Sequence, residues 1–363
     1  MKTSILIIGS TGKLGSILLN YCRKNSIKID ATTCYSNAKK LSRQKSLFNI
    51  SNSFCMSIDH EKNLFLKYIK NNFFNIIYFL DCGPESIEIA NKLLIKNKKC
   101  YFAIANKELI IAGGHILQNK IKKTSNYFIP LDSEHFSLNK SNLDKNLIDK
   151  IFITASGGPF YFKKRINLNK VKLPQVLSHP KWKMGINNSI DSSNFINKIL
   201  EIYELSIIYN VDIKKIEFLI SKEAYIHSII LYKDGSIIFN CFDNNMLITL
   251  SSPLRIFFNL KKISISKKYL SIKNFKLEEF NDNRFKLNKY YSIFKNLKHS
   301  QLVQFIILNN IAQSYYLSNK IKYYDIYDFI FKNLSTRKIN FKNLNEILRY
   351  IKTNRLYLSK KYE

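Results

Sequence analysis

The chain has 363 residues, of which 46% are hydrophobic, and a formal net charge of +32 at pH 7. This length exceeds what one ordinary hydrophobic core accommodates, so two or three domains are expected. No stretch approaches the roughly 20 apolar residues that a membrane-spanning helix needs, and no membrane partner is expected. The six cysteines lack paired spacing, so the sequence predicts neither a disulfide framework nor a zinc site.

The positive charge raises the hypothesis of a nucleic-acid-binding protein. Lysine is spread over the whole chain rather than clustered. This distribution favours solvated surface charge that attracts a phosphorylated substrate over a long range. We therefore expect no specific nucleic-acid partner. The first strand begins close to Met1 and leaves no room for a targeting segment, so a cytoplasmic location is expected.

The N-terminal part alternates apolar runs with amphipathic segments. The expected elements are a strand over 4–8, a helix over 15–24, a strand over 75–80, a helix opened by Pro84 and a strand over 100–105. Such alternation is typical of a parallel, doubly wound sheet of the α/β class.

The middle of the chain has a different pattern, with short strands and one strong helix. The expected elements are strands over 127–131 and 151–154, a loop-rich stretch over 174–188, a helix after Ser192, and a hairpin of 226–232 and 237–239 around the turn 233–236. Helices are expected over 301–318, 324–334 and 344–358. Their helical apolar spacing predicts a C-terminal helical bundle.

The segment Gly9-Ser10-Thr11-Gly12-Lys13-Leu14-Gly15 joins the first strand to the first helix. Glycines in this position allow a tight turn and let backbone N–H groups approach a pyrophosphate at the helix N-terminus. Leu14 stands where a Walker loop has serine or threonine, so the pattern favours a dinucleotide over a nucleoside triphosphate.

Two acidic side chains, Asp132 and Glu134, follow the strand over 127–131. Residues two apart in a strand face the same side, so the two carboxylates are predicted to lie together. Adjacent carboxylates need a cation or a proton, and hard oxygen ligands suit Mg²⁺ or Mn²⁺. The alternative is a solvated strand end.

A third motif lies at the helix expected after Ser192, for which this serine is the predicted N-cap. Asn197 and Glu201 are four residues apart and share one helical face, with Lys198 beside them. The arrangement suits phosphate and metal binding; the alternative is an exposed amphipathic face.

Two loops complete the set of candidate motifs. Ser156-Gly157-Gly158 follows a strand and offers backbone donors suited to an anion. His179-Pro180-Lys181-Trp182-Lys183-Met184-Gly185 holds the only tryptophan in a segment that favours a lid over a ligand. A simple turn and a structural histidine are the alternatives.

Together with Ala105-Asn106-Lys107-Glu108, these motifs occur in the order found in the 1-deoxy-D-xylulose 5-phosphate reductoisomerase family. The chain resembles that family most strongly over 100–240 and weakly over 30–75 and after 255. The resemblance implies an enzyme that rearranges and then reduces this phosphorylated sugar, with NADPH and one divalent cation, Mg²⁺ or Mn²⁺, in non-mevalonate isoprenoid precursor synthesis. A homodimer is also implied.

The resemblance assigns roles to individual residues. The implied metal ligands are Asp132, Glu134 and Glu201. Substrate and its phosphate are assigned to Lys107, Ser133, Glu134, Ser156, His179, Ser192, Asn197, Lys198 and Glu201. Cofactor binding is assigned to Thr11, Gly12, Lys13, Leu14, Asn37, Asn106, Glu108 and Gly185. Trp182 and Met184 are expected to close over the bound substrate.

The implied architecture is α/β with several parts. The expected divisions are an N-terminal Rossmann-like domain with a parallel sheet over 1–125, a central α+β catalytic domain over 126–255 with a lid near 177–188, a linker over 256–285 and a C-terminal helical bundle over 286–363.

Some segments depart from the family pattern. The adenosine 2′-phosphate is expected near 35–37, where Lys39 or Lys40 would supply the cation. The helix segment 309–313 lacks the acidic residue usual in the family. A different nicotinamide-dependent dehydrogenase of a small carbonyl compound remains the alternative. That hypothesis would explain the glycine turn but not Asp132 together with Glu201.

Overall fold

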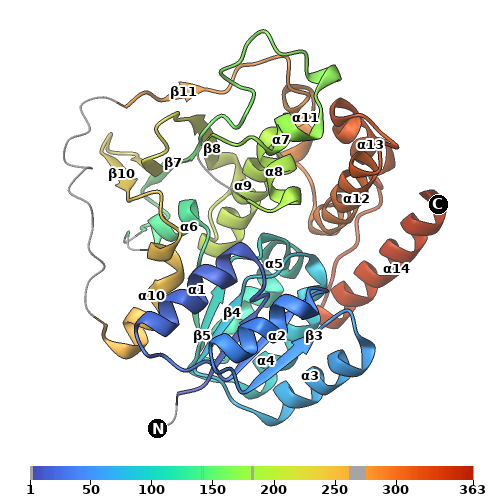
Figure 1. Ribbon diagram of the computed structural model, residues 1–363. Helices are drawn as coiled ribbons and strands as arrows, with labels where there is room; N and C mark the ends of the chain where they lie inside the picture. The colour runs from blue at the N-terminus through green and yellow to red at the C-terminus, as the bar shows by residue number, and fades with distance from the viewer. Residues whose placement is uncertain (1–2, 140, 142, 181–183, 261–274, 363) are drawn as a thin grey trace. The chain divides into compact units, whose positions relative to one another are not determined.

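The structure, a computed structural model, describes residues 3–139, 141, 143–180, 184–260 and 275–362 (Figure 1). The chain divides into two compact units. Unit 1 comprises Met1–Lys140 and Asp243–Leu270, and unit 2 comprises Ser141–Phe242 and Ser271–Glu363. The four divisions predicted from the sequence stay a prediction.

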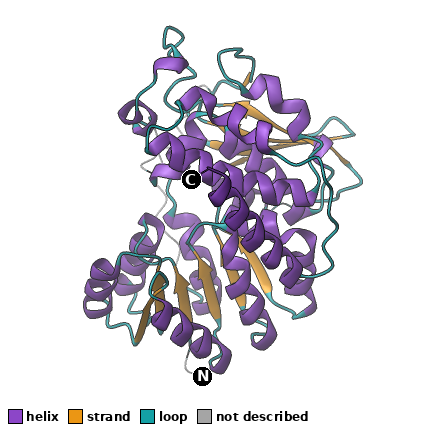
Figure 2. Ribbon diagram, turned by 90° about the vertical axis from the view of Figure 1, so that its right-hand side faces the viewer, coloured by secondary structure: helices purple, strands orange, loops and turns teal. Residues whose placement is uncertain are grey.

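A six-stranded parallel sheet in the order β3-β2-β1-β4-β5-β6 forms the core of unit 1. Its strands are β1 (Ile5–Ile8), β2 (Ala31–Cys34), β3 (Asn52–Cys55), β4 (Ile76–Phe79), β5 (Tyr101–Ile104) and β6 (Tyr127–Pro130). The two central strands, β1 and β4, are buried along their whole length because helices cover both faces of the sheet (Figure 2). The expected doubly wound sheet is confirmed.

The helices of unit 1 follow the strands in alternation. They are α1 (Lys13–Lys24), α2 (Ala38–Leu47), α3 (Asp59–Asn71), the 3-10 turn η1 (Pro84–Ser86), α4 (Ile87–Lys96), α5 (Lys107–Lys123), α6 (Ser133–Leu138) and α10 (Leu247–Phe258). Helices α3, α4 and α5 pack one against the next, and α10 packs against α1. The buried Tyr78 hydroxyl donates to the Leu250 carbonyl at 2.9 Å and ties α10 to the sheet.

Unit 2 is built on a mixed sheet in the order β10-β9-β7-β8-β11. Its strands are β7 (Ile148–Ala155), β8 (Ile216–Ile220), β9 (Ile226–Tyr232), β10 (Ile237–Cys241) and β11 (Glu278–Glu279). Strand β7 pairs in parallel with β8 and antiparallel with β9. The predicted hairpin is confirmed, because β9 and β10 pair antiparallel around a turn that contains Gly235.

The helices of unit 2 include the bundle expected at the C-terminus. They are α7 (Leu173–Leu177), α8 (Ile186–Ser193), α9 (Ile196–Tyr209), α11 (Leu287–Phe294), α12 (His299–Leu317), α13 (Ile326–Asn333) and α14 (Leu344–Tyr362), with 3-10 turns η2 (Leu168–Lys170), η3 (Ile213–Lys215) and η5 (Tyr323–Asp325). Helix α12 packs against α13, α14 and α8. Within the described ranges, no helix is both long and apolar enough to cross a bilayer.

Two local expectations need correction. The stretch 174–188 is not simply loop, since Pro174 lies in the first turn of α7, where proline is tolerated, and α8 begins at Ile186. Pro84 opens the 3-10 turn η1 rather than an α-helix, and α4 follows it directly.

Replacing Gly9 with alanine is expected to destabilise unit 1 more than Gly235→Ala destabilises unit 2. Both glycines have φ of +86°, but a Cβ at Gly9 would lie 2.6 Å from the Asp81 backbone nitrogen, whereas nothing lies within 4 Å at Gly235. We expect Gly235→Ala to lower the free energy of unfolding by about 1–2 kcal/mol, because of the backbone conformation alone. Gly9→Ala should lower the free energy of unfolding by a further ~1–3 kcal/mol because of overpacking, and urea unfolding measures both changes. Equal losses would contradict this account.

Candidate functional site

The glycine segment lies at the carboxyl end of β1, where the strand order of the sheet reverses. Gly9 packs against the Asp81 backbone, and a Cβ at Gly15 would lie 2.3 Å from the Ser10 carbonyl oxygen. Gly12 is the N-cap of α1, and no side chain caps that helix end. Thr11, Gly12, Lys13 and Leu14 are all at least partly exposed. An uncapped helix N-terminus at the reversal of strand order is the geometry that accepts a dinucleotide pyrophosphate.

The end of β2 lies beside the residues predicted to bind the adenosine 2′-phosphate. Asn37 caps α2 by accepting from the Lys40 backbone N–H at 3.0 Å. The Lys40 ammonium donates to the Thr11 carbonyl at 2.7 Å, so it joins this end of α2 to the glycine segment. Asn37 and Lys39 are exposed. The arrangement leaves a basic, solvent-facing helix start where a 2′-phosphate was expected.

Asn106 connects the ends of β4 and β5 inside unit 1. Its side-chain oxygen accepts from the Leu109 N–H at 2.9 Å, and its nitrogen donates to the Gly83 carbonyl at 3.1 Å and to Asp81 at 3.3 Å. Asn106 is 1% exposed, so its side chain is held by these contacts inside unit 1. Burial raises the pKa of Asp81 to about 6, against hydrogen bonds from Ser86 and Asn106 that lower it.

Burial also raises the pKa of Glu108, opposed by a backbone hydrogen bond and the positive charge of Lys107. Glu108 lies in the first turn of α5, which follows the end of β5.

Lys107 and Asp132 form an ion pair of 3.1 Å at the ends of the neighbouring strands β5 and β6. Their side chains are only 10% and 14% exposed, so the pair is largely removed from water. His135, which is fully buried, places Nδ1 3.9 Å from the other Asp132 oxygen. Glu134 accepts a hydrogen bond from the Ser133 hydroxyl. Unit 1 thus gathers Lys107, Asp132, Ser133 and Glu134 around one end of its sheet.

The predicted reason for the pairing of Asp132 with Glu134 is wrong. The strand ends at Pro130, Asp132 is the N-cap of α6, and Glu134 lies in the first turn of that helix. The two carboxylates therefore share a helix N-terminus rather than one face of a strand. The partial positive charge of a helix N-terminus favours negative side chains there.

In unit 2, the loop Ser156-Gly157-Gly158 leaves the end of β7 with positive φ at both glycines. A Cβ at Gly158 would lie 3.0 Å from the Ser192 carbonyl oxygen, so this loop and the end of α8 lie against each other. Glycine is required here both for the left-handed backbone and for the close approach. The structure therefore brings Ser156 and Ser192, which are far apart in the sequence, into one region.

His179 joins the same region, because its Nε2 lies 3.2 Å from the Ser156 hydroxyl. Burial, together with the positive charge of Lys198, lowers the pKa of His179 to about 4. The ring is consequently neutral at physiological pH, and it can donate or accept a hydrogen bond.

Helix α9 carries the candidate carboxylate of this unit. Glu201 is 2% exposed and accepts hydrogen bonds from the Lys198 ammonium and the Asn197 amide. The predicted sharing of one helical face by Asn197 and Glu201 is confirmed. An ammonium, an amide and a carboxylate so placed can bind an anion and a cation side by side.

The prediction that Ser192 is a helix N-cap is wrong. Ser192 lies inside α8, which ends at Ser193, and α9 begins at Ile196 after Phe195 in a left-handed conformation. Asn194 is the residue whose side chain accepts from the Ile196 N–H, at 3.0 Å. The N-cap of α9 is Phe195, three residues after Ser192, because the chain breaks between two helices and the sequence did not reveal this break.

The lid is described only in part. Trp182 lies outside the described residues. Gly185 is exposed and is the N-cap of α8, and Met184 is half-buried beside it. Their assigned contacts with cofactor and substrate stay predictions.

One set of contacts beside the Ser156–Gly158 loop, made by Arg284, was not predicted from the sequence. Arg284 donates to the carbonyls of Tyr161 at 3.1 Å and Lys163 at 2.9 Å, and pairs with Asp282 at 2.7 Å. It therefore fixes the turn that follows Gly157-Gly158. The segment was expected to be a linker, and no spacing signal in it points to a contact with residues more than a hundred positions earlier.

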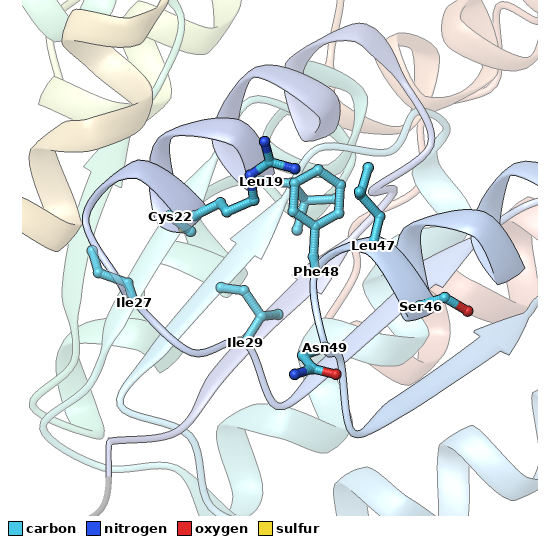
Figure 3. A pocket seen from close by; sticks show the side chains of 9 residues that line it. Leu19, Cys22, Ile27, Ile29, Ser46, Leu47, Phe48 and Asn49 are labelled. Carbon is cyan, nitrogen blue, oxygen red and sulfur yellow. The ribbon is translucent and has the colours of Figure 1, made fainter.

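A cavity of about 280 Å³ lies elsewhere in unit 1, between the ends of α1 and α2 (Figure 3). Its lining includes Cys22, Ile29 and Phe48. These residues lie near the amino ends of β2 and β3, whereas the glycine segment follows the carboxyl end of β1. This cavity is therefore separate from the glycine segment, and none of Gly9–Gly15 lines it.

A doubly wound sheet with a glycine turn at its strand-order reversal, and a second unit that gathers Ser156, His179 and Ser192 and buries Glu201, define the class of dinucleotide-dependent α/β enzymes that act on anionic substrates. The model of the 1-deoxy-D-xylulose 5-phosphate reductoisomerase C-terminal domain matches residues 128–209. The relative from Pelagibacter ubique (strain HTCC1062), named 1-deoxy-D-xylulose 5-phosphate reductoisomerase, is 35% identical and covers 94% of this chain and 93% of its own length. The chain belongs to the 1-deoxy-D-xylulose 5-phosphate reductoisomerase family.

Other comparisons agree. The relative of the same name from Francisella tularensis subsp. novicida (strain U112) is 30% identical, covering 98% of both chains. The solved reductoisomerase from Zymomonas mobilis in complex with NADPH has a TM-score of 0.83 at 20% identity and covers 100% of both chains. A solved DOX-P reductoisomerase with NADPH, fosmidomycin and magnesium has a TM-score of 0.86 at 21% identity, covering 99% of this chain and 98% of its own. The family and the α/β fold inferred from the motifs are thereby confirmed.

His179 is expected to titrate near pH 4 rather than near its ordinary value of 6.5. A histidine whose pKa is lowered on folding binds more protons when unfolded, so its contribution to stability is present above about pH 6.5 and is lost as the pH falls towards 4. NMR titration of the six histidines, with His179→Gln for assignment, measures the midpoint. Lys198→Met should raise the midpoint. A wild-type value near 6.5 would refute the burial argument.

Proposed function

We propose that the protein converts 1-deoxy-D-xylulose 5-phosphate to 2-C-methyl-D-erythritol 4-phosphate, in isoprenoid precursor synthesis by the non-mevalonate pathway. The observation that carries this proposal is the buried Glu201 on the same helix as Asn197 and Lys198, in a unit that also brings His179 to Ser156. The relatives named for this reaction span nearly the whole chain. The proposed activity is that of an NADPH-dependent oxidoreductase.

NADPH is the proposed cofactor, and the residues of unit 1 fit it. A Cβ at Gly9 or Gly15 would overlap neighbouring backbone atoms, so the tight turn of the glycine segment needs both glycines, and α1 has no side-chain cap to compete with a phosphate. Lys39 and Lys40 stand at the start of α2, where a 2′-phosphate needs a cation. When bound, NADPH supplies the hydride for the reduction. Asn106 and Glu108 would lie near the bound cofactor.

One divalent cation, Mg²⁺ or Mn²⁺, is proposed to be bound by Asp132, Glu134 and Glu201. The donor chemistry fits, because all three offer carboxylate oxygens, which these hard cations prefer. In the structure, Asp132 and Glu201 are each paired with a lysine ammonium. When bound, the metal ion polarises the substrate ketone and orients a neighbouring hydroxyl.

The residues of the chain then have distinct tasks. Ser156, Ser192, Asn197 and Lys198 are proposed to bind the substrate phosphate and nearby hydroxyls, with the neutral His179 as a further hydrogen-bonding partner. Lys198 balances the phosphate charge, while Lys107 and Ser133 would contact the sugar near the carboxylates. The lid over 177–188 would exclude water while carbon–carbon bonds rearrange.

A homodimer in the cytoplasm is proposed as the working form. Strand β10 is an edge of the unit 2 sheet, and its side chains Ile237, Ile238 and Phe239 are 52%, 42% and 44% exposed. An edge strand with exposed apolar side chains is a template for pairing with another chain. A second copy of this chain is the occupant that the resemblance implies.

Glu201→Gln is expected to abolish turnover while leaving the protein folded, because it removes a charged oxygen ligand without changing the volume of the side chain. Loss of reduced-nicotinamide absorbance with substrate, Mg²⁺ and NADPH measures activity, and we expect a decrease of at least about 100-fold. Glu217→Gln is the matched control, since Glu217 lies on β8 in a surface pair with Lys150. Folded wild-type protein without turnover on either nicotinamide would overturn the proposed reaction. Metal-independent turnover would favour a different dehydrogenase.

Phe239→Lys is expected to yield a monomer, because a charge in the middle of β10 opposes edge pairing. Light scattering after size-exclusion chromatography measures the mass. Ile293→Lys is the control, an exposed isoleucine on α11 with 47% exposure. A wild-type monomer, or a variant that remains a dimer, would contradict the proposed interface.

A further inference from the structure

The segment 191–194, which comprises the last three residues of α8 and Asn194, contains Ser192, and side chains of the C-terminal helices bind the residues around it. Asp191 is 6% exposed. It accepts hydrogen bonds from the Asn309 amide at 3.1 and 3.0 Å, one to each carboxylate oxygen, and from the Gln313 amide at 2.6 Å. Asn309 and Gln313 are one turn apart on α12, which packs against α8 (Figure 1).

The next two residues of the segment are held in the same way. Ser193 Oγ lies 3.0 Å from the Tyr323 hydroxyl of η5, and the Tyr327 hydroxyl of α13 donates to the Asn194 carbonyl at 2.8 Å. Ser193 and both tyrosines are buried. Every immediate neighbour of Ser192 is therefore fixed by a side chain from the C-terminal helices, while Ser192 itself remains half-exposed.

The contacts to Asp191 differ in kind from apolar packing. A buried carboxylate that loses its donors keeps its full desolvation cost, so it moves towards water or takes up a proton. Either change would shift the end of α8. The Ser192 carbonyl would move with it, and this carbonyl lies so close to Gly158 that a Cβ there would be 3.0 Å from its oxygen, so the Ser156–Gly158 loop would be displaced as well.

We infer that Asn309 and Gln313 are positioning residues of the substrate phosphate site, which act through Asp191 to hold Ser192 and the Ser156–Gly158 loop in register. This inference rests on the proposed function of Ser156 and Ser192. It assigns to the C-terminal helices a part in substrate recognition that none of their own side chains performs by contact.

The test compares Asn309→Ala, Gln313→Ala and the control Asn310→Ala in the full-length protein. Asn310 is the adjacent amide on α12, is half-buried, and makes no side-chain hydrogen bond among those described. Three quantities are measured for each folded variant: kcat and KM for 1-deoxy-D-xylulose 5-phosphate, KM for NADPH, and the Kd of inorganic phosphate by calorimetry.

We expect Asn309→Ala and Gln313→Ala to raise the substrate KM and the phosphate Kd at least fivefold, with kcat and the NADPH KM within twofold of wild type. Asn310→Ala should match wild type throughout. A merely structural role would lower the melting temperature and leave the phosphate Kd of the folded protein unchanged, which would overturn the inference. If Asn309→Ala does not fold, Gln313→Ala, which removes one of the three hydrogen bonds, decides alone.

The phosphate measurement also separates two possible failures. Wild-type protein that binds phosphate but does not turn over the sugar would sink the proposed reaction, and the variants would still test the positioning role through Kd. Wild-type protein that turns over the sugar but shows no difference among the three variants would sink the positioning role alone.

Discussion

A carboxylate withdrawn from water needs hydrogen-bond donors or a cation, and this requirement organises both units of the protein. In unit 1, Lys107 pairs with the largely buried Asp132. In unit 2, Lys198 and Asn197 hold Glu201, and two amides hold Asp191. Each of these carboxylates belongs to, or adjoins, a group of residues assigned to substrate or metal. The fold must therefore stabilise the same carboxylates that are proposed to bind or position ligands.

The sequence was sufficient for the fold class and the family. Continuous apolar runs such as Ile5–Ile8 and Ile76–Phe79 can be buried on both faces only in a covered parallel sheet, and the glycine segment follows the first of them. The order of the motifs identified the family. These signals depend on short segments and on their order along the chain, so a surface rich in lysine does not obscure them.

Features that depend on tertiary contacts could not be read in this way. Ser192 resembles a cap by residue type, but it lies inside α8, and Phe195 is the N-cap of α9. Asp132 and Glu134 are spaced like neighbours on a strand, yet a helix begins between them. Asn309 and Asp191 are 118 residues apart, and no periodicity links an amide in one helix to a carboxylate in another. Arg284, in a segment without any motif, was missed for the same reason.

The path of the chain through unit 1 has a consequence for its synthesis. Helix α10 comes from residues 247–258, more than a hundred positions after β6 ends, and it covers α1 and receives the buried Tyr78 hydroxyl through Leu250. A ribosome that has released only the first 140 residues has therefore produced a sheet with one flank bare and a tyrosine lacking its acceptor. The contacts of α10 with unit 1 can form only after residues 141–242 of unit 2 have been synthesised.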